Sequence, residues 1–477
     1  MRKGLIAAVI ILAAAAYARM LVSHLSRAAA GSDASGYLNE ARLIASSRAS
    51  ISNDPLRRLG LDASWAETFA PRGFVPDAAS RAALVPVYPP GVPLHLAVAA
   101  MIGEWGPAPF LIGPLAAFGC LALTFALGRT LGLPPLWSVG ASAMLAAFPT
   151  LIFIAVQPMS DVVATFWTLA AIVCALRAQP KAPLALMAGA AFAVSVAVRP
   201  SDALLALPLA FAIGWSRRNL LLAAAGALPF ALALMAWNGA VYGSVWRTGY
   251  GNALSLMAWS NGPKGAAHHG FWLAALLTPL VFPAGLLVGF DRRVAPRIRA
   301  VLVSWFGVFF LFYCFVGVYG MGWWATRYLL PAVPSLLIGA LLIVRGIRGE
   351  LALAALLIAV CVLNGAVQTK HRHVLRIADN EAVYPEAVAM ASAKATPDAM
   401  IVAMQSSGAL LYYDGRLAVR WDMLDPARFA RLRTASGAAP WFALVAGFER
   451  ADFRRRLPGR WVLIDHRRDF ELWRLEP

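Results

Sequence analysis

Residues 300–345 read AVLVSWFGVFFLFYCFVGVYGMGWWATRYLLPAVPSLLIGALLIVR, and this stretch decides the class of fold. It holds two apolar segments of about 20 residues, the length that crosses the hydrocarbon core of a bilayer. A short aromatic segment with Arg327 and Pro331 separates them, and Arg345 closes the second. The pattern predicts two membrane-spanning helices that are joined at one face of a membrane.

The composition of the whole chain agrees with a membrane protein. Of 477 residues, 60% are hydrophobic and 14% are charged, and the mean hydropathy is +0.66, whereas about 25% of residues are charged in a typical soluble domain. The net charge of +18 does not indicate nucleic-acid binding, because such proteins gather their basic residues on one face or tail. Here the basic residues stand in short groups between apolar segments, as the positive-inside rule describes.

Eleven segments are predicted to cross the membrane: 4–23, 107–128, 136–156, 159–177, 183–198, 202–215, 219–237, 271–290, 300–319, 328–345 and 350–367. With the N-terminus in the cytoplasm, every cytoplasmic turn carries Lys or Arg. These basic positions are Arg129, Arg177, Lys181, Arg217, Arg218, Arg292, Arg293, Arg297, Arg299, Arg345 and Arg348. The first span is expected to be an uncleaved anchor, since its apolar run continues past the small-residue motif at 16–18 to Val22.

Three regions are then predicted to lie outside the cytoplasm, at about 24–106, 238–270 and 368–477. In the first, the apolar stretch 91–105 is too short for a span and is predicted to be a helix on the outer leaflet. The last reads as a small α/β domain. Its predicted strands are Met400 to Met404, Leu417 to Trp421, Trp441 to Val445 and Trp461 to Asp465, and its predicted helices are Ala382 to Ala395, Asp425 to Arg433 and Arg450 to Leu457. The expected domains are thus 1–367, with 24–106 as a loop of amphipathic helices, and 368–477.

The first outer loop supplies two candidate site residues. Asp33 and Tyr37 are four residues apart, on one face of a predicted helix, and Asp33 is either a helix cap or a functional carboxylate. Tyr88 precedes Pro89 and Pro90, which fix an extended entry into the outer helix. Tyr88 is either part of a plain turn or a residue beside a lipid headgroup.

Two membrane-boundary positions follow. Asp161 begins an apolar run, where a carboxylate is costly and is usually paired or functional; a helix cap is the equal alternative. Arg199 stands before Pro200 between two short apolar segments. An ionisable break of this kind must line a cavity or be covered by protein.

The remaining candidates lie near later outer segments. Tyr242, Arg247 and Tyr250 follow a membrane helix, in a setting that suits sugar stacking as well as an ordinary aromatic belt. Arg327 can bind a phosphate at the leaflet surface with its planar guanidinium, or it can snorkel. His268 and His269 are adjacent, and a solvated loop is favoured over a metal site for them.

The sequence holds no nucleotide or phosphate-binding loop. The four cysteines, Cys120, Cys174, Cys314 and Cys361, lie in apolar stretches without metal-ligand spacing. The candidate site faces outward, where no nucleotide is expected. A donor substrate for this site would therefore have to be carried across the membrane on a lipid.

Taken in order, these motifs resemble the GT-C superfamily of polyprenyl-phosphate-sugar-dependent glycosyltransferases, especially the branch of bacterial protein O-mannosyltransferases and aminoarabinose transferases. The resemblance covers about residues 1–367. It rests on Asp33-x-x-x-Tyr37, Tyr88-Pro89-Pro90, Met159-Ser160-Asp161, Arg199-Pro200, the stretch 238–250 and Arg327-Tyr-Leu-Leu-Pro331. Their order and topology carry the resemblance, since each motif alone is common.

The resemblance implies roles for these residues. Asp33 would be the general base toward the acceptor hydroxyl, Asp161 would shape the site, and Arg327 would bind the carrier phosphate, with Arg199 and Tyr88 beside it. Some branches hold a divalent metal, for which Asp33 and Asp161 would be the ligands here. Ala34 replaces a second acidic residue that many members carry, and Asp161 stands where Glu is frequent; both departures argue against a tightly bound metal.

The sequence therefore predicts a multi-pass enzyme of a bacterial inner membrane, with its N-terminus cytoplasmic and its C-terminus periplasmic. It would transfer a sugar from a polyprenyl-phosphate donor to a glycan, lipid or protein acceptor of the envelope, with inversion. The alternatives are a transporter or flippase of lipid-linked sugars, which would favour repeat symmetry and charges at mid-membrane, and a non-catalytic scaffold of polysaccharide assembly. Neither the sugar nor the acceptor is readable from the residues.

Overall fold

The computed structural model describes residues 2–179, 181–251 and 253–476. The chain folds into two compact units, each assembled from separate stretches of sequence. The helical unit comprises Met1–Leu25, Leu111–Leu234 and Asn252–Ile377, and the mixed unit comprises Ser26–Phe110, Met235–Gly251 and Ala378–Pro477.

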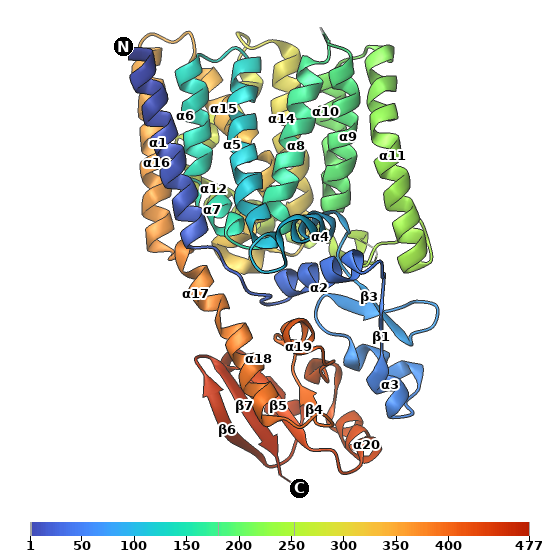
Figure 1. Ribbon diagram of the computed structural model, residues 1–477. Helices are drawn as coiled ribbons and strands as arrows, with labels where there is room; N and C mark the ends of the chain where they lie inside the picture. The colour runs from blue at the N-terminus through green and yellow to red at the C-terminus, as the bar shows by residue number, and fades with distance from the viewer. Residues whose placement is uncertain (1, 180, 252, 477) are drawn as a thin grey trace. The chain divides into compact units, whose positions relative to one another are not determined.

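The helical unit is a bundle whose long helices run side by side (Figure 1). Its main helices are α1 (Arg2–Ser23), α5 (Ile112–Thr130), α6 (Pro135–Ala146), α7 (Pro149–Ala155), α8 (Ser160–Arg177), α9 (Pro183–Val198), α10 (Ala206–Ile213), α11 (Arg217–Tyr242), α12 (Gly262–Leu277), α13 (Val281–Leu287), α14 (Pro296–Phe315), α15 (Val333–Val344) and α16 (Glu350–His371). Short 3-10 turns join some of them, notably η3 (Pro200–Leu205) and η7 (Tyr319–Ala332). Every predicted span overlaps one of these helices or a broken pair.

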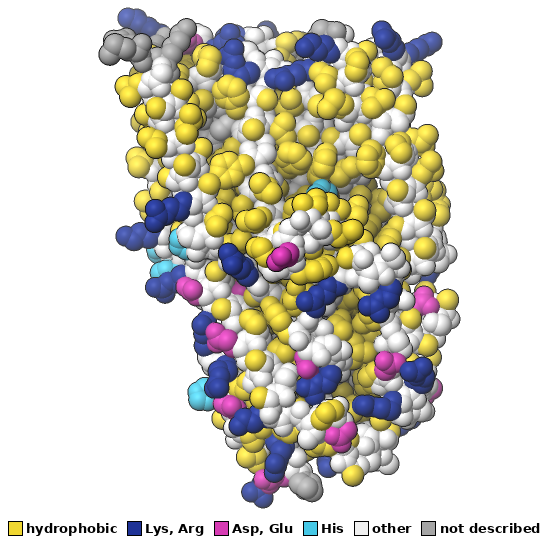
Figure 2. Space-filling model, viewed as in Figure 1, with side chains coloured by type: hydrophobic (Ala, Val, Ile, Leu, Met, Phe, Trp, Pro, Cys, Tyr) yellow, Lys and Arg dark blue, Asp and Glu magenta, His cyan; other side chains and the backbone are white. Residues whose placement is uncertain are grey.

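This is a multi-pass membrane protein. Among the described residues, six helices are long and apolar enough to cross a membrane, and the number rises to eight if two bent pairs each count as one span. Shorter apolar helices, including Pro183–Val198 and Pro200–Ile213, accompany them. Lys and Arg side chains gather at the end of the bundle that holds the N-terminus, whereas the flanks of the helices are hydrophobic (Figure 2). This distribution is the one that the positive-inside rule requires.

Two predicted spans are bent. The segment predicted as a straight span at 271–290 is instead divided between α12 and α13, whose axes differ by 112°. Thr278, between the two helices, has φ of 82° and precedes Pro279, and a residue before proline is disfavoured in the α conformation. Pro149 likewise begins α7, which is bent by 64° from α6.

The mixed unit contains two sheets. In the first, β1 (Ile51–Ser52), β3 (Ala83–Pro86) and β2 (Phe74–Pro76) pair antiparallel in that order. In the second, the order is β4 (Met400–Val402), β5 (Trp441–Ala446), β7 (Phe470–Leu475) and β6 (Trp461–Arg467), with β4 parallel to β5 and the other pairs antiparallel. Helix α18 (Val383–Lys394) packs against the second sheet (Figure 1).

The first outer loop folds with the C-terminal segment, so the prediction that it belongs to the membrane domain is corrected. Trp65 and Phe69, from the loop, share one hydrophobic core with Trp421, Phe429 and Trp441. The loop's own elements, such as α3 (Asp54–Arg58), are too short to cover its aromatic side chains. The loop therefore buries these side chains against the C-terminal segment. This shared burial places the first outer loop in the mixed unit.

Most local predictions outside the bundle agree with the structure. The predicted outer helix is α4 (Gly91–Gly103), and three of the four predicted C-terminal strands are β4, β5 and β6. The predicted helices are α18, α20 (Pro426–Ser436) and α21 (Arg450–Arg456). The strand predicted at 417–421 is wrong, because only Val419 forms an isolated bridge, to Val402. Helix α19 (Ser407–Asp414) and strand β7 were not predicted.

Candidate active site

The two predicted carboxylates lie in different units, and each has its own set of partners. In the mixed unit, Asp33 is the first residue of α2 (Asp33–Ala45), and Ser32 occupies the N-cap position without a side-chain cap bond. Oδ1 of Asp33 accepts a hydrogen bond of 2.9 Å from the Tyr88 hydroxyl. The interpretation of Asp33 as only a helix cap is therefore not supported, since the carboxylate bonds to a tyrosine from a distant part of the chain.

Tyr88 is held tightly against α2. A methyl group at Gly36 would lie 2.3 Å from the Tyr88 ring, so only glycine permits this approach. The ring also lies 4.5 Å from that of Tyr37 and 6.1 Å from that of Tyr250, between centroids. Burial and then the Asp33 carboxylate raise the pKa of Tyr88 far above its usual range. Tyr88 thus stays a neutral hydrogen-bond donor.

The end of α11 and the segment after it complete this aromatic group. The Tyr242 hydroxyl donates to the carbonyl oxygen of Pro86 at 3.1 Å, and a methyl group at Gly249 would meet the Val87 carbonyl oxygen at 2.2 Å. Tyr250 is 43% exposed, and Arg247 is also exposed. The structure thus brings Asp33, Tyr37, Tyr88, Tyr242 and Tyr250 together from three separate segments.

In the helical unit, Asp161 and Arg199 form an ion pair. Asp161 lies in the first turn of α8, and Arg199 follows α9 in an extended conformation. Nη1 of Arg199 lies 2.8 Å from Oδ1 of Asp161, and the two side chains are 9% and 3% exposed. A buried charge needs such a partner, so Asp161 serves as more than a helix cap.

Tyrosines extend this pair toward Arg327. Nη2 of Arg199 donates to the Tyr313 hydroxyl at 2.9 Å, and that hydroxyl donates to Oγ of Ser201 at 2.7 Å. The Tyr313 ring stacks on that of Tyr328 at 5.1 Å. Nη2 of Arg327 donates to the Tyr328 hydroxyl at 3.1 Å, and its guanidinium lies 5.3 Å from the centre of the Trp324 ring. Two arginines and stacked aromatic rings thus form one cluster, where α8 begins and α9 and α14 end.

Sequence reasoning missed several members of these groups. Tyr313 lies within a predicted span, and the sequence pattern around it does not indicate a hydrogen bond to a residue at the end of α9. Asp202 is completely buried and accepts from Thr168 at 3.4 Å; its place beside Arg199 and Pro200 was the available signal. Glu40 lies seven residues after Asp33, on the same helix face. It is completely buried, and burial raises its pKa well above the usual range.

The prediction of a solvated loop at His268 and His269 is wrong. Both lie inside α12, and His269 is completely buried. The ring of His268 lies 3.1 Å from the Gly322 carbonyl oxygen, measured from Nε2. The helix starts earlier than predicted because Pro263, at one of its first two positions, suits a helix start.

The donor set does not fit a resident metal. No group of three or more His, Cys, Asp or Glu side chains that could hold an ion occurs in the described part of the chain. Asp161 is paired with Arg199, and Asp33 accepts from Tyr88.

Comparison with protein-family models and with curated proteins gives no match. Solved structures do match. The apo crystal structure of ArnT from Cupriavidus metallidurans has a TM-score of 0.61 and 13% identity, over 99% of this chain and 98% of that chain. ArnT bound to undecaprenyl phosphate has a TM-score of 0.60 and 12% identity, over 98% and 97%. The archaeal oligosaccharyltransferase AglB from Archaeoglobus fulgidus, in complex with an inhibitory peptide and a dolichol-phosphate, has a TM-score of 0.55 and 12% identity, over 96% and 71%.

ArnT, an aminoarabinose transferase, and AglB are both GT-C glycosyltransferases. The agreement covers nearly the whole of this chain and of ArnT, including the C-terminal segment, for which the sequence motifs had implied little. The chain therefore has the GT-C fold, as the order of its motifs predicts, whereas the eleven crossings and their orientation stay predictions.

Proposed function

We propose that this protein is a glycosyltransferase that moves a sugar from a polyprenyl-phosphate carrier to an acceptor outside the cytoplasm. The observation that carries the proposal is the match, over nearly the full length of both chains, to ArnT bound to undecaprenyl phosphate. Fold alone does not determine activity. The site residues supply the second support.

The proposed reaction is a single displacement. The acceptor oxygen attacks the anomeric carbon, the bond from that carbon to the phosphate oxygen breaks, and the electron pair leaves with polyprenyl phosphate. The acceptor proton passes to the Asp33 carboxylate, which acts as general base. One displacement inverts the anomeric centre.

Tyr88 supports this role of Asp33. Its hydroxyl donates to Oδ1 at 2.9 Å, and its ring is held between α2 and the Tyr250 segment. A carboxylate that is held in one orientation can accept the proton without reorganising first. Tyr250, which is 43% exposed, adds aromatic surface on which a sugar ring can stack, and the buried Tyr37 packs against Tyr88.

Arg327 is proposed to bind the carrier phosphate. Its guanidinium is planar and permanently charged, and it can meet two phosphate oxygens at once. Tyr328 and Trp324 hold it in place. Charge develops on the phosphate as the sugar leaves, and a fixed cation stabilises that charge.

Arg199 remains a predicted second ligand of the phosphate. It has five N–H donors and already donates hydrogen bonds to Asp161 and Tyr313. To bind phosphate it would share its donors between two anions. We therefore assign its main effect to positioning Tyr313 and, through the stacked rings, Tyr328.

The helical unit also offers space for a lipid chain. An apolar cavity of about 1,090 Å³ is lined by α1, α5, α6 and α16. Lys370 and Arg376 contribute to the same lining, so an anionic headgroup would find cations beside it. This supports a lipid-linked donor over a soluble one.

The basic residues support an orientation of the protein in the membrane. We propose a bacterial inner-membrane location with the Lys- and Arg-rich end of the bundle in the cytoplasm and both predicted acidic site residues on the periplasmic side. A cysteine introduced at Asp398 should then react with a membrane-impermeant maleimide in intact spheroplasts. Labelling only after lysis would reverse the assignment.

The proposal is tested by deleting the gene in its host and complementing with the wild type or with Asp33→Asn. Polyprenyl-phosphate sugars and envelope glycans are profiled by mass spectrometry, and immunoblots verify the membrane level of each variant. We expect the variant to accumulate one polyprenyl-monophosphate sugar and to lack that sugar in one glycan. If Asp33→Asn restores the wild-type profile, the mechanism is wrong and transport or scaffolding becomes the better explanation.

A further inference from the structure

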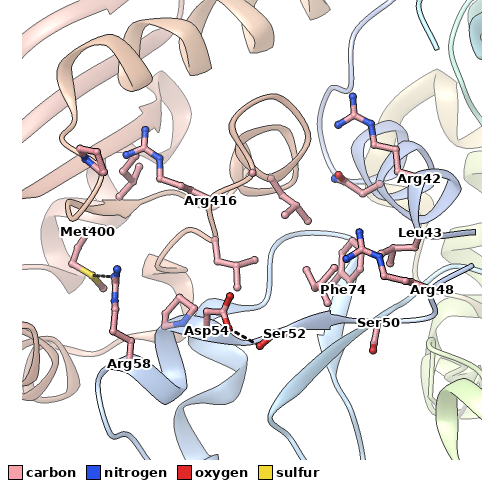
Figure 3. Close-up of a pocket in the computed structure, with 18 of the residues that line it drawn as sticks. Arg42, Leu43, Arg48, Ser50, Ser52, Asp54, Arg58, Phe74, Met400 and Arg416 are labelled. Atoms are coloured by element: carbon pink, nitrogen blue, oxygen red, sulfur yellow. Dashed lines mark hydrogen bonds between the residues drawn. The ribbon is translucent and has the colours of Figure 1, made fainter. Parts of the chain in front are cut away.

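The mixed unit contains a cavity that the proposed chemistry does not use. Its volume is about 590 Å³, within the range of about 300–1,000 Å³ that is typical of ligand pockets. Its lining comes from the first outer loop and from residues 397–417. Figure 3 shows Arg42 and Arg48 on one side of this cavity and Arg58 and Arg416 on the other.

The cavity has an excess of positive charge. Its charged lining consists of these four arginines and Asp54. Asp54 is bonded to Arg57 at 2.9 Å and to Ser52 at 2.7 Å. Within the described part of the chain, only Arg416 of the four has a carboxylate partner, Asp414. The positive charges of Arg42, Arg48 and Arg58 therefore share one cavity without a carboxylate of the described residues paired to any of them. An anion between these guanidinium groups would relieve their repulsion.

One of these arginines is fixed before any ligand arrives. The Arg42 guanidinium lies 3.5 Å from the centre of the Tyr412 ring and also donates to the Tyr412 carbonyl oxygen. A cation that is held over an aromatic face has few rotamers to lose on binding. Arg48 and Arg58 are exposed, and their planar forks can pair with a carboxylate or phosphate through two bonds.

The rest of the lining suits a sugar better than a lipid or a bare ion. The side chains of Ile51, Leu411 and Leu417 contribute partly exposed apolar surface, against which the C–H face of a pyranose can lie. Asn39, Ser50 and Ser52 also line the cavity, and amides and hydroxyls are natural partners of sugar hydroxyls. A lipid chain would find the arginines unfavourable, since their charge would be left unpaired.

We infer that this cavity binds an anionic saccharide, one whose sugar residues carry carboxylates or phosphates, and that this saccharide is the acceptor of the proposed transfer. The acceptor role rests on the proposed function; the binding does not. The Arg-lined cavity would hold the charged sugar residues of the saccharide, while the hydroxyl to be glycosylated lies outside this cavity.

The test measures binding to the full-length protein in detergent by microscale thermophoresis at low and high salt. The probes are tetragalacturonate, a deacylated phosphorylated lipopolysaccharide core, neutral maltotetraose and tetraglutamate. We expect one or both anionic saccharides to bind, more weakly at high salt, and maltotetraose and tetraglutamate not to bind. Comparison of the two anionic probes distinguishes carboxylate from phosphate recognition.

Two double variants with the same charge change make the test specific. Arg48→Gln with Arg58→Gln should weaken binding by about tenfold or more, because two charge-assisted contacts are lost. Arg455→Gln with Arg460→Gln is the control: both residues are exposed, lie outside the cavity and pair with Asp452 and Glu476, respectively. It should bind within about twofold of the wild type.

The outcomes separate this inference from the proposed function. Equal binding of maltotetraose or tetraglutamate, failure of both anionic saccharides, or wild-type affinity in the Arg48/Arg58 variant would overturn the site. Asp33→Asn should bind like the wild type even though it does not transfer sugar. If the Arg48/Arg58 variant does not bind but still glycosylates the native acceptor in cells, the acceptor role is overturned and the proposed function stands.

Discussion

Nη1 of Arg199 lies 2.8 Å from Oδ1 of Asp161, and together these residues connect the start of α8 with the end of α9. Both side chains are buried, so either charge left alone would be uncompensated. We expect Asp161→Leu or Arg199→Met alone to destabilise the protein by about 3–5 kcal/mol. The midpoint of thermal unfolding in detergent, followed by tryptophan fluorescence, measures the effect.

The matched control for this pair removes both charges. Arg199→Met combined with Asp161→Leu should recover much of the lost stability, because no unpaired charge remains. The double-mutant cycle then isolates the coupling between the two residues. Single variants that unfold at the wild-type temperature would show that the ion pair does not contribute to the free energy of unfolding.

Tyr88→Phe tests the support that the Tyr88 hydroxyl gives to Asp33. The variant keeps the ring against Gly36 but loses the 2.9 Å bond. Since a hydrogen bond to a charged group is worth about 1.5–3 kcal/mol, we expect kcat to fall by about tenfold or more, with little change in KM. Steady-state kinetics with the native donor and acceptor check this. An unchanged kcat would contradict the positioning role.

Gly36→Ala tests the close approach of Tyr88 to α2. The new methyl group would lie 2.3 Å from the ring, so the ring must shift away from Asp33, at a cost of about 1–3 kcal/mol. We expect a lower unfolding temperature together with weaker transfer. Gly270→Ala, at a helical glycine with open space around it, is the control and should be neutral or slightly stabilising.

Glu381 is expected to make stability depend on pH. It is partly buried and accepts a hydrogen bond from Ser26, and burial raises its pKa from 4.5 to about 7. Between these pH values the folded state binds more protons than the unfolded state. The free energy of unfolding therefore falls as pH rises through this window, by at most about 1.4 kcal/mol per pH unit.

Glu381→Gln should remove that part of the pH dependence, because an amide does not titrate. Thermal unfolding midpoints collected from pH 4.5 to 8 for the wild type and the variant measure the difference. Parallel curves for the two proteins would mean that Glu381 does not titrate in this range.

Periodicity and charge explain why the membrane part was predictable. An apolar run of about 20 residues needs lipid whatever its neighbours are, and Arg129, Arg217 and Arg345 each mark a turn on the same side of the bundle. The same local rules located β5 and α18 in the C-terminal segment. Local rules did not locate the break at Thr278, although Pro279 was a signal for it.

Partnerships between distant residues were not predictable in the same way. Tyr313 is an ordinary aromatic residue in an apolar helix until α9 brings Arg199 within 2.9 Å of its hydroxyl. Arg42 and Arg48 lie in or just after α2, whereas Arg416 lies more than 350 residues later in the C-terminal segment. The core that Trp65 and Phe69 share with Trp421 shows that the first loop and the C-terminal segment form one unit.

Local features of the chain are enough to predict that it spans a membrane, which end of its helices is basic, and that Asp33, Asp161 and Arg327 are candidates for chemistry. The reason is that burial of apolar residues and placement of charge act locally along the chain. The folded molecule was needed to show that Asp33 accepts from Tyr88, that Asp161 is neutralised by Arg199, and that four arginines line one cavity. Such pairs depend on which helices and loops pack together, and packing is set by side-chain shape over the whole molecule.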